Sequence, residues 1–115
     1  MKASQQARLW YVQRISAAVL ALCVLIHLAT ILYAMQGGIS SAEILARTRG
    51  NAVVALFYLL FVVAAAVHAP IGLARISEEW LGWRGRSLNI VMWILCLLLL
   101  GSGAIAVWGL VGGQP

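Results

Sequence analysis

The sequence predicts an all-α membrane protein in which three transmembrane helices form a single domain over residues 1–115. Its composition is the first observation behind this prediction. Hydrophobic residues make up 63% of the 115-residue chain and charged residues 10%, and the mean hydropathy is +0.98. A soluble domain of this size has too much surface to bury so much apolar side chain. Lipid must therefore be part of its solvent.

Three long apolar runs are the second observation. Each can cross a hydrocarbon core of ~30 Å, which takes about 20 helical residues. They cover about residues 15–34, 52–74 and 88–111, and none contains Lys, Arg, Asp or Glu. The first run is too long for the apolar part of a secretory signal and holds a histidine, so we expect it to be retained.

The positive charges predict the orientation. Two arginines, Arg47 and Arg49, lie in the first loop, and the other six basic residues lie in the N-terminal segment and the second loop: Lys2, Arg8, Arg14, Arg75, Arg84 and Arg86. Because basic loops stay on the cytoplasmic side, we expect a cytoplasmic N-terminus and a C-terminus on the opposite side. The expected location is the cell's inner (cytoplasmic) membrane, which the chain crosses several times. The basic residues form no patch with interleaved aromatics, so no nucleic-acid partner is expected.

The segments between the runs carry weaker signals. Residues 1–9 are polar, and we expect them to be frayed or to lie on the membrane surface. Ser40–Glu43 matches a capping-box pattern, which predicts a short surface helix over Ser41–Arg47. Arg75–Ser87 is expected to be an interfacial loop. The small residues at 101–104 would let a neighbouring helix approach the third span closely.

Each of the first two spans contains one histidine, His27 and His68. An ionisable side chain in hydrocarbon is costly and usually functional. The alternative is a neutral histidine that hydrogen-bonds across helices as a packing residue. Zinc needs about four N, S or O ligands, and no third or fourth polar donor lies at either depth. The pair of histidines therefore favours haem ligation over a bare metal ion.

The helix face of His68 strengthens this interpretation. At about 100° per residue, the face also holds aromatic, small and charged residues: Phe57, Phe61, Ala64, Ala65, Gly72, Arg75 and Glu79. The small residues give the clearance that a macrocycle coordinated at Nε2 needs. Arg75 lies two turns away, about 10 Å along the axis, where it could pair with a haem propionate. The alternative is an alanine-rich packing face with an ordinary arginine at the membrane boundary.

The depths of the two histidines differ. Measured from the cytoplasmic boundary at 1.5 Å per residue, His27 is about 18 Å deep and His68 about 9 Å. They cannot easily share one iron within a single chain, so each needs a ligand from another subunit. In a parallel homodimer with its two-fold axis along the membrane normal, paired His68 residues would hold one haem and paired His27 residues a second, deeper one. A different chain with matching histidines would serve equally.

The motifs around both histidines resemble a known family. Gln13–Ser16 resembles the H-R-x-S start of succinate dehydrogenase cytochrome b anchors. His68–Gly72, with Glu79 eleven residues after the histidine, is similar to the H-x-x-x-G…D pattern in membrane subunits of succinate dehydrogenases and fumarate reductases. That resemblance implies that His68 is an axial ligand of haem b. The position of His27, late in the first span, is similar to that of the distal haem ligand in the single-chain, two-haem anchors of this family. Those anchors consist of two related halves, each with the length of this chain.

The resemblance covers roughly residues 10–110 and implies a function. The chain would be a cytochrome b type anchor that binds flavoprotein and iron–sulfur subunits on the cytoplasmic face, beside a second anchor subunit that is either an identical copy or a different chain. It would pass electrons between the iron–sulfur subunit and a membrane quinone, which is the substrate. The chain has no flavin fingerprint and no cysteine set for a cluster. We therefore expect an electron-transfer subunit without catalytic residues of its own.

The quinone site is the part of the pattern from which the sequence departs. Trp10 stands where quinone-binding members often have serine, and Gln13 replaces a common histidine. Ser16 and Arg14 are the candidate quinone residues; the alternative is that Arg14 snorkels and Ser16 caps backbone. Two other functions remain open. One is a haem-free hydrophobic anchor, and the other is a small oligomeric proton-coupled transporter, against which the lack of an intramembrane carboxylate counts.

Overall fold

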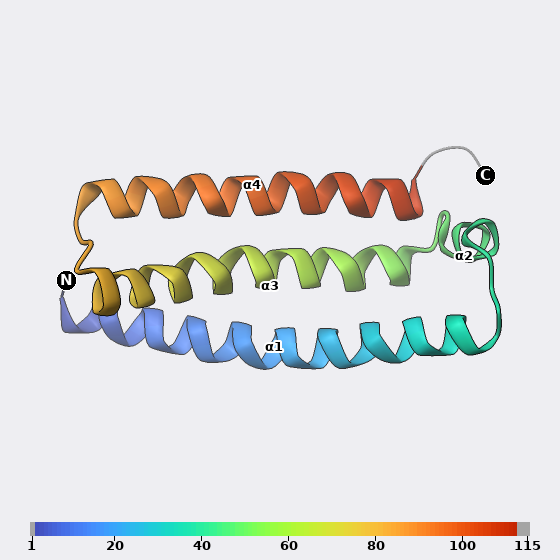
Figure 1. Cartoon of the computed structure of the whole chain (residues 1–115), viewed down its shortest axis with the longest axis horizontal. Coiled ribbons are helices and arrows are strands. Elements are labelled where there is room, and N and C mark those ends of the chain that lie inside the picture. Colours follow the sequence, from blue (N-terminus) through green and yellow to red (C-terminus); the bar gives the residue numbers. More distant parts are fainter. Residues whose placement is uncertain (1, 113–115) are drawn as a thin grey trace.

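The protein is a bundle of three long helices, described here by a computed structural model over residues 2–112 (Figure 1). Its elements, in chain order, are α1 (Ala3–Gln36), α2 (Ser41–Thr48), α3 (Ala52–Ile76), the π-helical turn η1 (Ser77–Leu81) and α4 (Arg86–Val111). By length and composition, three helical segments can cross a membrane: α1, α3 continued through η1, and α4. The three predicted spans lie within them, so the predicted fold class is confirmed.

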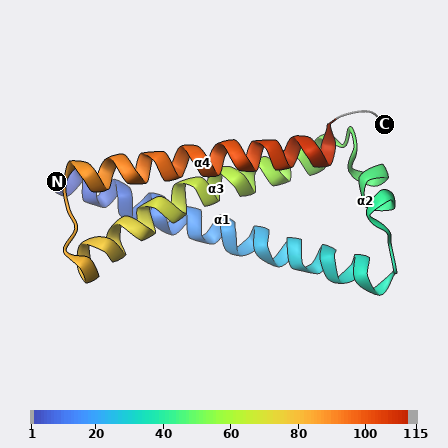
Figure 2. The same cartoon turned by 45° about the horizontal axis from the view of Figure 1, so that its top comes forward.

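The middle helix of the bundle is α3, which packs against both α1 and α4 (Figure 1). The start of α1 and the connection from η1 to α4 lie at one end of the bundle, termed the N-terminal end. α2 lies at the other end, termed the α2 end. Figure 2 shows that α1 crosses α3 and separates from α4 toward the α2 end. The bundle is therefore more open at the α2 end.

The first helix is longer than its apolar run. α1 begins at Ala3, so the expectation of a frayed or surface-lying segment over residues 1–9 is wrong for residues 3–9; Met1 lies outside the described residues. The added turns are rich in Ala, Gln and Arg, which favour helix, and they extend a helix whose nucleation cost is already met by the span. At 34 residues, α1 is about 51 Å long, well beyond a hydrocarbon core.

The expected loop after the second span is also partly helical. α3 continues to Ile76, and η1 adds a π-helical turn through Leu81. Gly82 then ends the helix with a left-handed φ of 66°, which glycine adopts without steric cost. π-helical turns are rare and often lie at functional sites.

The predicted short helix is confirmed as α2, which ends one residue later than expected, at Thr48. Of the predicted capping box, only the hydrogen bond to the Ser40 side chain is present among the described residues. Ser40 Oγ accepts a hydrogen bond of 3.2 Å from the Glu43 backbone N–H and begins α2. The end of α2 is tied to the end of α4. Thr48 Oγ1 donates to the Leu110 carbonyl at 2.8 Å, and the Gly50 N–H donates to the Val111 carbonyl at 2.7 Å. The connection between α2 and α3 thus holds the last turn of α4.

The small residues of α4 allow a close helix approach at one position. A Cβ added at Gly103 would overlap the side chain of Val62 on α3, whereas one added at Gly101 would meet no atom within 4 Å. The close approach predicted from the sequence is therefore confirmed at Gly103.

We expect Gly103→Ala to destabilise the bundle by about 1–3 kcal/mol, the usual cost of overpacking. Val62 cannot easily move aside because a β-branched side chain has one strongly preferred rotamer in a helix. Thermal unfolding of the purified chain in detergent measures the effect. Gly101→Ala is the matched control and should leave the midpoint unchanged or slightly raised. Equal destabilisation by both substitutions would contradict close packing at Gly103.

Candidate functional site

His68 on α3 is held against α1 by a hydroxyl group. Its Nδ1 lies 3.3 Å from Ser16 Oγ, and Ser16 Oγ donates to the Gln13 carbonyl at 3.1 Å. A hydroxyl has one proton. With that proton directed at the carbonyl, Ser16 accepts from Nδ1–H of His68. The neutral imidazole then carries its proton on Nδ1 and its free lone pair on Nε2, the arrangement of a metal-ligating histidine.

His27 on α1 has a comparable partner on α3. Its Nδ1 lies 3.0 Å from the Tyr58 hydroxyl, and the two rings meet edge to face with centroids 5.6 Å apart. The ring of Phe61 also meets the His27 ring edge to face, with centroids 5.8 Å apart. Phe61 was expected on the face of His68 but contacts His27. When Tyr58 accepts from Nδ1–H, Nε2 of His27 is likewise free to coordinate.

The two contacts fix the register between α1 and α3. Ser16 is level with His68, and His27 is level with Tyr58. Ser16 and His27 are eleven residues apart on α1, which corresponds to about 16 Å along the helix. The histidines are therefore farther apart in depth than the sequence estimate of about 9 Å. This supports the expectation that they do not share one iron within a chain.

Gly72 allows α1 to lie close beside α3 near His68. A Cβ added at Gly72 would come within 3.2 Å of Gln13 Nε2. The Gln13 amide therefore occupies part of the clearance that was expected for a macrocycle. Gln13 Oε1 is buried and has no hydrogen-bond partner among the described residues. Such a buried acceptor is costly unless another group, such as a second subunit or a ligand, supplies a donor.

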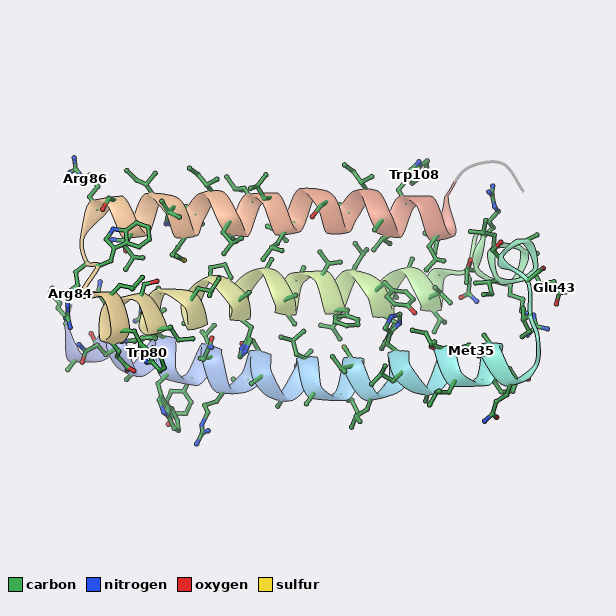
Figure 3. All side chains as sticks on the ribbon, in the orientation of Figure 1. Met35, Glu43, Trp80, Arg84, Arg86 and Trp108 are labelled. Carbon is green, nitrogen blue, oxygen red and sulfur yellow. The ribbon has the colours of Figure 1, made fainter. Side chains whose placement is uncertain are left out.

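Among the described residues, no hydrogen bond joins either candidate arginine to the imidazole of His68. The Arg14 guanidinium lies over the Trp10 ring, 5.0 Å from its centroid, in a cation–π contact within α1. Arg75 lines a cavity between α3 and α4, and His68 does not. Basic and aromatic residues continue at the same end, where Figure 3 shows Trp80, Arg84 and Arg86.

Two cavities lie along the helices. The larger, of about 970 Å³, is at the α2 end between the diverging helices. Its wall is mainly apolar, and its polar lining residues include His27, Tyr58, Thr30, Arg47 and Ser102. The smaller, of about 330 Å³, lies between α3 and α4 toward the N-terminal end. The larger cavity falls within the size range of ligand pockets in proteins.

The set of donors fits a cofactor that brings its own ligands. Within residues 2–112, no group of three or more His, Cys, Asp or Glu side chains could hold a metal ion. Haem supplies four nitrogens of its own and needs only axial ligands from protein, so one histidine at each depth fits it. Reasoning from single helix faces missed Tyr58. Its hydroxyl inside an apolar run was the available signal, but pairing it with His27 required the helix register.

A family model described as "Succinate dehydrogenase/Fumarate reductase transmembrane subunit" matches residues 1–111 of the chain. Comparison with curated proteins and with solved structures finds no match.

Proposed function

This chain belongs to the succinate dehydrogenase/fumarate reductase transmembrane subunit family, and we propose from that premise that it is a haem-binding anchor of the cytochrome b type. It is a multi-pass membrane subunit of such a complex. In the proposal, the N-terminal end faces the cytoplasm and binds the iron–sulfur and flavoprotein subunits. The chain then helps to carry electrons between the iron–sulfur subunit and a membrane quinone.

The observation that carries the proposal is the hydrogen-bond chain from Gln13 through Ser16 to His68. It holds the imidazole against α1 and leaves Nε2 with its lone pair. A haem bound there supplies one-electron redox chemistry. His68 would hold the haem, and Ser16 with the Gln13 carbonyl would orient the ring of His68. Arg75 and Gly72 remain predicted haem contacts, on the grounds given by the sequence.

A second haem at His27 is supported by a different observation. The cavity of about 970 Å³ lies directly against His27, and Arg47 lines it at the α2 end. A flat apolar macrocycle needs such a space beside its axial ligand, and an arginine suits its propionates. The hydroxyl of Tyr58 would accept the Nδ1–H of His27 and fix the ring.

Each haem would also need a ligand from a second anchor subunit. His68 and His27 are about 16 Å apart along the helices, so neither histidine can be the second ligand of the iron that the other would bind. A second copy of this chain, or a chain with matching histidines, would place like residues at like depth. The unpartnered Gln13 Oε1 beside Gly72 is consistent with a donor from outside the chain.

The contacts of Ser16 favour a different role from the quinone contact expected from the sequence. Ser16 is 6% exposed. Its hydroxyl already donates to the Gln13 carbonyl and contacts His68 Nδ1. We propose that it positions His68. Arg14 is exposed and remains the residue of that motif that a quinone can reach.

The test is a reduced-minus-oxidised visible spectrum of membranes that contain the assembled complex, with haem counted per chain. We expect a b-type α-band. A self-paired dimer with two haems gives about one haem per chain, and a value near one half would leave His27 unliganded. Correctly assembled protein without haem would overturn the proposal and leave a haem-free anchor.

We expect Ser16→Ala to weaken haem retention about 10- to 100-fold, the usual effect of losing a group that orients a metal ligand. The haem midpoint potential should also rise, because a ligand that no longer donates from Nδ1 is less basic and stabilises ferric iron less. The haem content of the purified complex per chain measures retention, and a redox titration measures the potential. Ser16→Thr keeps the hydroxyl and should retain normal behaviour. A changed quinone KM with an unchanged haem potential would instead support a quinone contact.

A further inference from the structure

We infer that the cavity between α3 and α4 binds one phospholipid whose head group carries a phosphate and a primary ammonium. This lipid would bind whether or not the complex holds haem. The cavity has a volume of about 330 Å³, within the usual range for small-molecule sites. It lies toward the N-terminal end, where Figure 2 shows η1 apart from the start of α4. Trp93 lines the cavity and is 67% exposed, so the cavity is open to the bilayer.

The inner part of the cavity fits an acyl chain. Its walls there are apolar and come from both helices: Ala66, Val67, Pro70, Ile71 and Ala74 on α3, and Met92, Trp93 and Cys96 on α4. From Ala66 to Ala74 the α3 wall rises by about 12 Å. These residues all lie within the apolar runs, at the depth of lipid tails. Packing against them replaces contacts with other lipids, so the choice of lipid depends on the head group.

The outer part of the cavity carries one charge of each sign. Arg75 directly follows the second apolar run, and Glu78 lies three residues farther along, about 4.5 Å closer to the membrane surface. Asn89 on α4 adds an amide to the lining. Both charged side chains are half-buried. The two charges therefore follow one another along the membrane normal, with the positive charge deeper.

Neither charge has a fixed partner among the described residues. Side chains three residues apart on a helix are close enough to pair. Nevertheless, among residues 2–112 no side-chain hydrogen bond involves Arg75, Glu78 or Asn89. A partly buried charge is costly without a partner. A ligand that brings a negative group to Arg75 and a positive group to Glu78 removes both costs.

The head group of phosphatidylethanolamine carries its charges in the matching order. Its phosphate joins the glycerol next to the acyl chains, and its ammonium is at the outer end. With an acyl chain along the inner wall, the phosphate reaches Arg75, whose guanidinium suits bidentate phosphate contacts. The ammonium then donates to the Glu78 carboxylate. Arg75 has five N–H donors, so it can hold this phosphate and also a haem propionate on the face of His68.

The carboxylate of Glu78 determines the selectivity among lipids. It repels phosphatidylglycerol, which has a phosphate but no cation. It also receives no hydrogen bond from phosphatidylcholine, whose methylated ammonium has no N–H. Arg84 and Arg86 lie at the same end of the bundle (Figure 3) but do not line the cavity. They attract anionic lipids to the surface in general and do not distinguish this site.

Lipid titration of the assembled complex tests the selectivity. Purified complex, stripped of lipid in detergent, is titrated with the three lipids in forms that share the same acyl chains, and native mass spectrometry counts the bound lipids. We expect one phosphatidylethanolamine per copy of this chain, bound at least about tenfold more tightly than the other two, a difference of about 1.4 kcal/mol. Glu78→Gln should abolish this preference. Glu79→Gln, the same change at an exposed position outside the cavity, should retain it. Equal affinities for the three lipids, or an unchanged preference in Glu78→Gln, would overturn the inference.

Photolabelling tests the location of the lipid. The probe is phosphatidylethanolamine with a diazirine in one acyl chain, and mass spectrometry of the complex locates its adducts. We expect adducts within residues 66–74 and 92–96 that excess unlabelled phosphatidylethanolamine suppresses. Ala74→Phe fills the cavity and should lower this labelling at least about tenfold, whereas Leu73→Phe, at an exposed neighbour outside the lining, should leave it unchanged. Adducts confined to other segments, or equal labelling in the two variants, would contradict this site.

Discussion

Replacing His68 with alanine should remove the haem held at that depth. If the partner anchor is an identical chain, both axial ligands disappear together and haem content falls by about half, since the two-fold axis pairs like residues. If a different chain supplies the other ligand, the haem changes from six- to five-coordinate and its α-band weakens. The visible spectrum and the haem count of the assembled complex distinguish these results, and both support ligation.

The control for this prediction opens a space at the position of the His68 side chain and supplies imidazole in solution as a substitute ligand. His68→Gly leaves a gap beside Ser16 that free imidazole can enter. Added imidazole should then restore the six-coordinate spectrum, which it would not do if His68 served only in packing. A spectrum and haem content unaffected by His68→Ala, in complex that assembles normally, would disprove ligation by this residue.

Replacing His27 with alanine should remove the second, deeper haem and leave the first. Adding His68→Ala to the His27→Ala variant should then remove the remaining haem as well. The expected loss is again about half of the haem, because the two histidines are too far apart to substitute for one another. Redox titration should show one midpoint potential in each single variant and two in the parent. Retention of both potentials in His27→Ala would show that the cavity beside His27 holds something else.

A tyrosine pair gives this prediction a finer control. Tyr58→Phe removes the hydroxyl 3.0 Å from His27 Nδ1 and should shift the potential of the deeper haem alone. Tyr33→Phe removes a hydroxyl from the same cavity, but Tyr33 makes none of the described hydrogen bonds to His27, so both potentials should stay unchanged. Shifts of equal size in the two variants would indicate a general change in cavity polarity.

The fold was largely predictable because membrane spans depend on a simple quantity, the length of an apolar run. The run from Ile15 to Ala34 identified the first span but missed the start of α1 at Ala3. Hydrophobicity locates the part of a helix inside hydrocarbon, whereas polar residues with high helix propensity continue it into water. The π-helical turn over Ser77–Leu81 was missed for a similar reason, since its charged residues resemble those of an interfacial loop.

The candidate site was predictable residue by residue but not contact by contact. His27 and His68 were identified because ionisable groups are rare in hydrocarbon. Their hydroxyl partners lie on opposite helices, and a helical wheel contains no information about the register between helices. Ser16 was a candidate quinone residue because of its place in the H-R-x-S motif, with backbone capping as the alternative. In the structure its hydroxyl donates to the Gln13 carbonyl and lies beside His68 Nδ1. Tyr58 was not identified at all.

The hydrogen bonds at the end of α4 affect how the protein fits bilayers of different thickness. The carbonyls of Leu110 and Val111 are bonded to Thr48 and Gly50 instead of depending on water, so this end of the helix tolerates contact with acyl chains. The opposite end of α4 begins at Arg86, whose charge keeps it among the head groups. A thicker membrane can therefore bring acyl chains up to the last turn of α4 without unwinding it, while the charges of Arg47 and Arg49 beside that turn extend to the head groups.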